Sequence, residues 1–378
     1  MEWDDYDSED DAESLALAVQ VAVLAIIVRR LGHMPEGVSW RWLERAIATD
    51  TGRIDRALEK GANECRALIR RMYADGADAV DGWASTYRDA RGLPEASWRE
   101  DGRMQGLVKA SGQRAYDSVA DLLRTRVVAI QGPNGIYVPV REAYRTIGGL
   151  AVQGMAGGSM DYMDAVRDAV NAVARGGLRV QYRSGATREL FAALRTNIVD
   201  GYRAHMDMLR DEAGKAFGAD GVEVSAHPLC AEDHGPFQGR QYTKAEFAKV
   251  NGNLARPIGE GMNCRHIVTP IIMGVSAPAY TEGQLRGYED DSHRRVSWTG
   301  MDGKERTATA YEATQHQRRV ESSYRRASAA RYLSGQAGLA DAERASAKRM
   351  ERIAEYYDRM CRQMGIDGRP ERLHIFTL

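Results

Sequence analysis

The spacing of apolar residues is helical over most of the N-terminal half of the chain. In AYDSVADLLRTRVVAI the apolar residues lie on one helical face: Val119, Leu122, Leu123 and Val127. The stretch ATRELFAALRTNIVDGYRAHMDMLRDEAGKAFG predicts one long helix. Between these two, LRVQYRS alternates apolar and polar residues and predicts a strand. We therefore expect residues 15–215 to form a mainly helical region.

Two more helices are predicted near the C-terminus, separated by SGQAGL. The second carries apolar residues at alternating intervals of three and four: Met350, Ile353, Tyr357, Met360 and Met364. This spacing makes one apolar stripe for packing on a partner helix. We expect residues 281–378 to form a helical hairpin region.

The pattern changes between these two helical regions. GVEVSAH, GRQYT and CRHIVTPIIM are typical of short strands, and Gly, Pro and Asn punctuate them. The cluster MGVSAPAYTEGQ then marks a boundary. We expect a compact module over residues 216–280. The predicted fold class is mainly α with a small α+β Cys/His module, placed between a helical N-terminal half and a C-terminal helical hairpin.

The N-terminus combines an acidic leader with an apolar run. MEWDDYDSEDDAES has eight acidic residues and no basic one, the opposite of a signal peptide, so residues 1–14 are expected to form a disordered acidic tail. Leu15 to Val28 is apolar except for Gln20. A bilayer needs about 20 residues of helix, so this shorter run predicts a helix buried in the protein or docked on another protein. We expect no stable membrane insertion.

Composition limits the classes of function. The net charge is −1, so contact with nucleic acid would depend on local patches. One such patch is the run from Arg318 to Arg349, which holds eight basic and three acidic residues. It is either a solvated helix face or a surface for DNA or an acidic protein. Four scattered cysteines do not make a disulfide framework, so reduced thiols are expected.

Two of those cysteines lie near histidines in the predicted module. Cys230 and His234 are four residues apart, and Cys264 and His266 are two apart, so the latter two share one side of a strand. Zinc favours four Cys and His ligands in a tetrahedron. The spacing predicts a structural zinc site made by Cys230, His234, Cys264 and His266. His227 is a further candidate. It could be a metal ligand, a group that contacts a ligand, or a residue with no part in the site.

Two other interpretations stay open for this cluster. The thiols could be small buried hydrophobic groups and the histidines hydrogen-bonded groups with no metal. The cluster could also be catalytic: His234 beside Asp233, with His266, resembles weakly the metal site of an HNH-type nuclease, and Cys230 could act as a nucleophile. A metal-dependent nuclease or hydrolase is therefore the alternative function.

The same segment resembles the core of the phage minor capsid protein 2 family, a relative of the Mu F-like minor head proteins. The matching residues are Cys230, His234, Gln238 to Tyr242, Pro257, Gly259 and Asn263 to His266. The endings AEYYDRMCRQMGI and RPERLHI are also similar, so the resemblance covers about residues 220–378. The stretch AEDHGPF departs from the family pattern, which has a more compact run between the first Cys and the following motif.

The resemblance implies a structural virion component that is not an enzyme. Such a protein would reside in the phage head near the portal, and in the host cytoplasm during assembly. Its partners would be the portal protein, the major capsid protein and packaged DNA, and it would act in head morphogenesis or in DNA packaging or delivery. In this setting the apolar helix over residues 15–28 would dock on a partner. A toxin-like effector is a further alternative, although no extra domain is evident.

Overall fold

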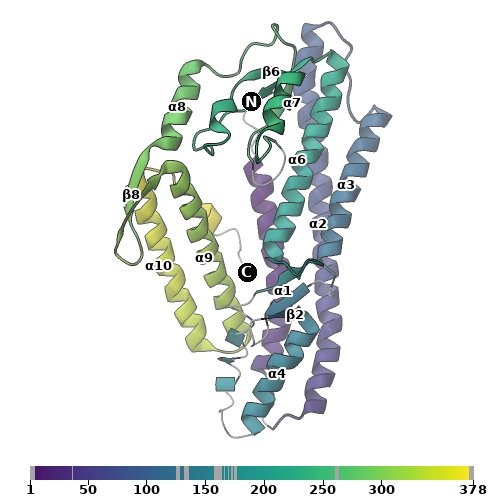
Figure 1. Cartoon of the computed structure of the whole chain (residues 1–378). Coiled ribbons are helices and arrows are strands. Elements are labelled where there is room, and N and C mark those ends of the chain that lie inside the picture. Colours follow the sequence, from purple (N-terminus) through teal and green to yellow (C-terminus); the bar gives the residue numbers. More distant parts are fainter. Residues whose placement is uncertain are drawn as a thin grey trace.

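The computed structural model describes residues 5–35, 37–124, 128–131, 136–156, 164–165, 167–168, 170–171, 173, 177–259 and 264–373. Four long helices form the body of the molecule and run side by side along its length (Figure 1). They are α1 (Asp5–Gly32), α2 (Trp40–Ala90), α3 (Gly102–Leu122) and α6 (Leu190–Phe217). The helical N-terminal half is confirmed. Most of residues 157–176, within the region expected to be mainly helical, lies outside the described residues.

Helix α2 is one continuous helix of 51 residues. Ser39 caps its start by accepting a hydrogen bond from the Trp42 N–H. Its buried side chains recur at helical spacing along its whole length, so one face packs on α1, α3 and α6. The body therefore has an extended apolar core.

One end of the body carries a small antiparallel sheet with the strand order β2-β1-β3-β4. Its strands are β1 (Val128–Gln131), β2 (Tyr137–Pro139), β3 (Arg179–Gln181) and β4 (Thr187–Glu189), and α4 (Val140–Ala156) follows β2. The strand expected in LRVQYRS is confirmed. The helix expected to continue through VVAI is wrong there, because Val128, Ala129 and Ile130 are a buried strand whose ladder takes up their backbone groups.

The N-terminal segment differs from its prediction. Helix α1 begins at Asp5, so the expected disordered tail over residues 1–14 is wrong from that residue onward. Glu13 explains part of this order: it is 3% exposed and lies 2.6 Å from a guanidinium nitrogen of Arg325. Arg195 and Arg372 lie within 4 Å of the same carboxylate. A buried charge needs such partners, and here they fix the acidic segment.

The apolar run in α1 is covered by the rest of the chain. The helix packs on α2, α6 and α9, and Val23, Ile27, Val28 and Leu31 have no exposed surface. The docking of this run on another protein is therefore wrong, because the chain supplies the partner surface itself. The helical stretch Asp11–Gly32 is long and apolar enough to cross a membrane, so the length argument does not hold. Of an apolar 18-residue window within it, 56% is buried within the fold.

The C-terminal helical hairpin is confirmed as α9 (Ala310–Gln336) and α10 (Ala340–Met364), which lie on one flank of the body (Figure 1). Ile353, Tyr357, Met360 and Met364 of the predicted stripe are buried, and Met350 packs at their edge. Sequence reasoning missed the hairpin of β8 (Arg295–Thr299) and β9 (Glu305–Thr309), which precedes α9. Its signal was present: Val296 and Trp298 alternate before an Asp-Gly turn.

The predicted basic run is spread over several surfaces of this hairpin. Arg325 is buried against Glu13, while Arg326 pairs with Glu189 and Arg331 lies 3.9 Å from Glu343. Arg344 pairs with Asp341. The run therefore does not form one continuous basic patch.

Candidate metal centre

The Cys/His module is built on a three-stranded antiparallel sheet with the order β6-β5-β7. Its elements are β5 (Gly221–Val224), η1 (Gly235–Phe237), β6 (Gln241–Thr243), α7 (Lys244–Gly252) and β7 (Val268–Ile271). Helix α8 (Glu282–His293) then leads through β8 and β9 to the C-terminal hairpin, and η2 (Pro370–Leu373) follows α10. The three expected strands are confirmed in shorter form.

Strand pairing explains why the two halves of the Cys/His cluster meet. Val224, the last residue of β5, pairs with Val268, the first residue of β7. The segment that follows β5 and the segment that precedes β7 therefore lie at the same end of these two paired strands. The first carries His227, Cys230 and His234, and the second carries Cys264 and His266. Both residues of the second segment precede β7, so their convergence comes from this shared end and not from a shared strand face.

Gly239, within the motif Gln238 to Tyr242, allows a tight turn in the module. Gly239 has a φ of 68°, and a Cβ there would lie 2.2 Å from a methyl carbon of Leu285 in α8. Its N–H donates to the carbonyl of Val224 at 2.9 Å. Glycine therefore suits both this left-handed turn and the close approach of Leu285.

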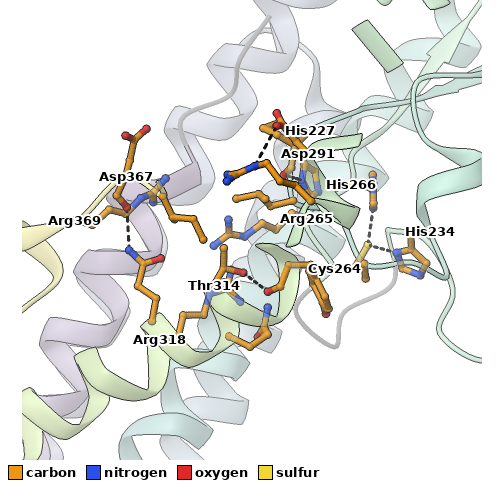
Figure 2. Close-up of a pocket in the computed structure, with 18 of the residues that line it drawn as sticks. His227, His234, Cys264, Arg265, His266, Asp291, Thr314, Arg318, Asp367 and Arg369 are labelled. Carbon is orange, nitrogen blue, oxygen red and sulfur yellow. Dashed lines mark hydrogen bonds and ion pairs between the residues drawn. The ribbon is translucent and has the colours of Figure 1, made fainter. Parts of the chain in front are cut away.

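His234, Cys264 and His266 form one candidate group of metal ligands. The Cys264 Sγ lies 3.5 Å from the Nδ1 of His234 and 3.5 Å from the Nδ1 of His266, and Figure 2 draws both contacts. Tetrahedral zinc with Zn–S and Zn–N bonds of about 2.3 and 2.0 Å separates a sulfur and a nitrogen ligand by about 3.6 Å. Both sulfur–nitrogen distances therefore fit zinc.

In both His234 and His266 the Nε2 atom makes a hydrogen bond, so Nδ1 is the nitrogen available to bind a metal. The Nε2 of His234 lies 2.7 Å from the carbonyl oxygen of Arg256, which can only accept, so this nitrogen carries the proton. The Nε2 of His266 lies 3.3 Å from the Gln238 Oε1. That oxygen also accepts from the His227 N–H, so His266 donates to it as well. This arrangement is typical of metal-ligating histidines.

Charge and burial agree with this assignment. Burial lowers the pKa of His266 to about 3, with a contribution from His227 and His234, so the ring is neutral and has a lone pair at pH 7. The Gly259 N–H donates to the Cys264 Sγ at 3.4 Å, so the sulfur already accepts one hydrogen bond at the site.

Cys230 lies in a second group with His227 and His266. Its Sγ is 3.5 Å from the Nε2 of His266, on the opposite side of that ring from Cys264. Its thiol donates to the Ala231 carbonyl at 3.3 Å, and burial raises its pKa to about 12. One imidazole cannot turn both nitrogens toward one ion. The structure therefore divides the predicted set of Cys230, His234, Cys264 and His266 into two groups that share His266.

His227 is the site residue that sequence reasoning left undecided. Its Nδ1 lies 3.0 Å from the Pro228 carbonyl, so its Nε2 carries a lone pair, and this buried atom has no hydrogen-bond partner among the described residues. The signal in the sequence was its place three residues before Cys230. Asn263, a residue of the recognised motif, lies outside the described residues.

The catalytic interpretations gain little support. Asp233 is held by Arg256, with a contact of 2.9 Å, and lies 4.0 Å from the His234 Nε2, so it does not orient that ring closely. A thiol with a pKa of about 12 is protonated at neutral pH, so Cys230 is not an activated nucleophile.

A cavity of about 580 Å³ lies beside the first group, between the module and the C-terminal hairpin (Figure 2). His234, Cys264 and His266 line one wall, and Thr314 and Arg318 of α9 line another. An ion held by the three ligands would therefore lie at a cavity wall.

Comparison with known proteins gives one match. A family model described as phage minor capsid protein 2 matches residues 18–357, which span the helical body, the Cys/His module and most of the hairpin. No curated protein and no solved structure matches the chain.

Proposed function

The chain belongs to the phage minor capsid protein 2 family, and we propose that it acts at the portal vertex of the phage head, in head morphogenesis or in DNA packaging and delivery. Membership makes it a bacteriophage virion protein with a structural role, which works through contacts with other head components. The observation that carries the proposal is the extent of the match, because residues 18–357 include most of the helical body, the whole Cys/His module and most of the hairpin. The portal protein, the major capsid protein and packaged DNA are the partners proposed.

An exposed apolar surface supports a protein contact at one end of the body. Trp40, at the start of α2, is 43% exposed. Its ring lies over Gly149 of α4, where an added Cβ would be 2.4 Å from a ring carbon of Trp40. The neighbouring Leu150 is 50% exposed. Large apolar groups that stay together on a surface mark interaction sites. We assign this surface, made by Trp40 and Leu150, to the contact with the portal.

In this function the Cys/His module is a small folded unit that a zinc ion stabilises. His234, Cys264 and His266 are the proposed ligands, and an ion bound to them would join the segment after β5 to the segment before β7. A module of this size buries little apolar surface, and small domains gain stability from structural metals. Zinc would act here as a structural ion with no reaction assigned to it.

The location is tested by electron cryomicroscopy of phage heads that carry a tagged form of the protein. Density for the tag at one unique vertex is expected, and tag distributed over all vertices would contradict a portal location. The contact is tested with the double variant Trp40→Asp/Leu150→Asp, which should reduce incorporation into heads at least about tenfold because an interface core excludes charge. Val275→Asp is the matched control, since Val275 is 76% exposed and lies far along the chain from this surface. Normal incorporation of the double variant would remove this surface from the contact.

A further inference from the structure

The cavity between the module and the hairpin is unusually rich in guanidinium groups. Six arginines line it among the described residues, against three acidic side chains. The arginines are Arg256, Arg265, Arg294, Arg318, Arg369 and Arg372, and the acids are Asp291, Glu321 and Asp367. They come from the loop after α7, the segment before β7, the end of α8, helix α9 and the C-terminal segment around η2. Segments that are distant in sequence thus bring positively charged side chains to one cavity.

Some of this charge has a structural role within the fold. Arg256 is paired with Asp233, and Arg372 lies 3.7 Å from Glu321. Arg294 donates to the main-chain carbonyls of Met364 and Gly365 and lies 4.0 Å from Asp291. The lining nevertheless holds six guanidinium groups against three carboxylates.

Arg265 and Arg318 bring guanidinium groups to the cavity from two different elements. Arg265 lies between two proposed metal ligands, whereas Arg318 projects from α9, and Figure 2 labels both at the cavity. Both guanidinium groups act electrostatically on His227, which also lines the cavity. The lining thus places two guanidinium groups close enough to act on the same side chain.

We propose that this cavity binds a phosphate monoester, either a free phosphate compound or the phosphorylated end of a DNA strand, with Arg318 and Arg265 as its main ligands. Guanidinium groups form paired hydrogen bonds with phosphate oxygens, and a phosphate monoester carries close to two negative charges. The volume of about 580 Å³ lies in the range typical of small-molecule sites and suits a group of nucleotide size. A DNA duplex is too wide to enter, so a strand would insert only its end. This binding site goes beyond the proposed role in the virion and does not require zinc.

Isothermal titration calorimetry of the full chain tests the proposal with four probes. They are inorganic phosphate, thymidine 5′-monophosphate, and a single-stranded DNA hexamer with and without a 5′-phosphate. We expect the phosphate-bearing probes to bind and the hexamer with a 5′-hydroxyl to bind at least about tenfold more weakly, because charge-assisted hydrogen bonds are lost. Tighter binding of the phosphorylated hexamer than of the mononucleotide identifies a DNA end as the ligand, and equal binding identifies a free phosphate compound.

A matched pair of neighbouring arginines separates the cavity from general surface charge. Arg318→Gln should weaken binding at least about tenfold, whereas Arg319→Gln should leave it unchanged, because Arg319 is the adjacent, exposed residue on α9 and does not line the cavity. Arg318→Lys keeps the charge without the paired geometry and should give an intermediate affinity, which guards against a folding defect in the glutamine variant.

Three results would overturn the proposal. One is the absence of binding by every phosphate-bearing probe. The second is equal binding of the two hexamers, which would place the contact on the DNA backbone at the surface. The third is an equal loss of affinity in Arg318→Gln and Arg319→Gln.

Discussion

The helical body and the Cys/His module are stabilised by different means. The body buries a continuous apolar cluster shared by α1, α2, α3, α4 and α6. None of the three apolar clusters in the described part of the chain takes a buried residue from 221–271. The module buries polar groups beside its few apolar ones. Glu223, His234, Gln238, Asn251 and His266 are buried together with Val222, Val224, Cys230, Ile258 and Ile271.

This difference has an energetic consequence. Apolar burial contributes about 25 cal/mol per Å² over a large area and tolerates local changes. A polar interior depends on each hydrogen bond, because a buried polar group that loses its partner costs about 1–3 kcal/mol. The module should therefore respond sharply to single changes at its ligands, and the body should respond in proportion to the apolar volume removed.

The largest effect is expected from loss of the proposed metal. Cys264→Ser should abolish zinc binding and destabilise the module by several kcal/mol, because structural zinc contributes roughly 10 kcal/mol or more in small domains. Elemental mass spectrometry should find about one zinc per chain in the wild type. Hydrogen exchange should become faster in residues 221–271 of the variant and stay slow in α2.

Cys230→Ser is the matched control for this prediction. Cys230 faces the opposite side of the His266 ring and has a protonated thiol, so this variant should keep its zinc. Equal loss of zinc in both variants would show that the two cysteines bind one ion, as the four-residue set from the sequence predicted. A wild type without zinc would leave the module held by hydrogen bonds alone.

A cavity in the body should have the next largest effect. Ile27 has no exposed surface and lies in the apolar cluster at α1. Ile27→Ala should lower the free energy of unfolding by about 2–5 kcal/mol, as measured by urea denaturation, without a change in zinc content. A loss of zinc in this variant would mean that the body and the module do not have separate sources of stability.

The body also contains a buried histidine that makes its stability depend on pH. His205 is 1% exposed, stacks on Tyr73, and lies 2.8 Å from the Ser111 hydroxyl. Burial lowers its pKa to about 4 from an ordinary value of 6.5. The unfolded chain therefore binds a proton between these pH values that the folded chain does not. Stability is complete above pH 6.5 and decreases as the pH falls toward 4, by about 2 kcal/mol at pH 5.

His205→Gln isolates this contribution because glutamine does not titrate. Urea denaturation at pH 7 and pH 5 should show a smaller loss of stability in the variant, by about 2 kcal/mol. Since all other titrating groups are common to both proteins, an identical pH dependence would show that His205 is not the group responsible.

The smallest effect is expected at a helix cap within the module. The Thr243 hydroxyl accepts from the Glu246 N–H at 3.2 Å, and the Glu246 carboxylate accepts from the Thr243 N–H, so α7 begins with a capping box. Thr243→Ala should cost about 1 kcal/mol, detected as faster hydrogen exchange in α7. The equivalent change at Thr309, which caps α9 beside a larger apolar cluster, should have less influence on local exchange, and the reverse order would contradict the proposed difference between the regions.

Local patterns in the sequence were enough for most elements of the fold. The long helix before the module, the stripe from Ile353 to Met364 and the strands β5, β6 and β7 each follow from spacing within a short window, because one repeating backbone geometry sets which side chains share a face. The predictions that were wrong depended on distant partners. Residues 5–14 resemble a disordered tail until Arg325 and Arg372 are placed beside Glu13.

The candidate metal centre shows the same division. The sequence alone indicated which segments hold the Cys and His residues, that they lie in a small α+β module, and that the chain resembles a phage minor capsid family. Only the tertiary structure decided that His266 turns one nitrogen to Cys264 and the other to Cys230, and that Arg265 and Arg318 line one cavity. The physical reason is that ring orientation and charge convergence are set by contacts across the pairing of β5 with β7 and the packing of α9, which join residues tens of positions apart and leave no periodic signal in the chain.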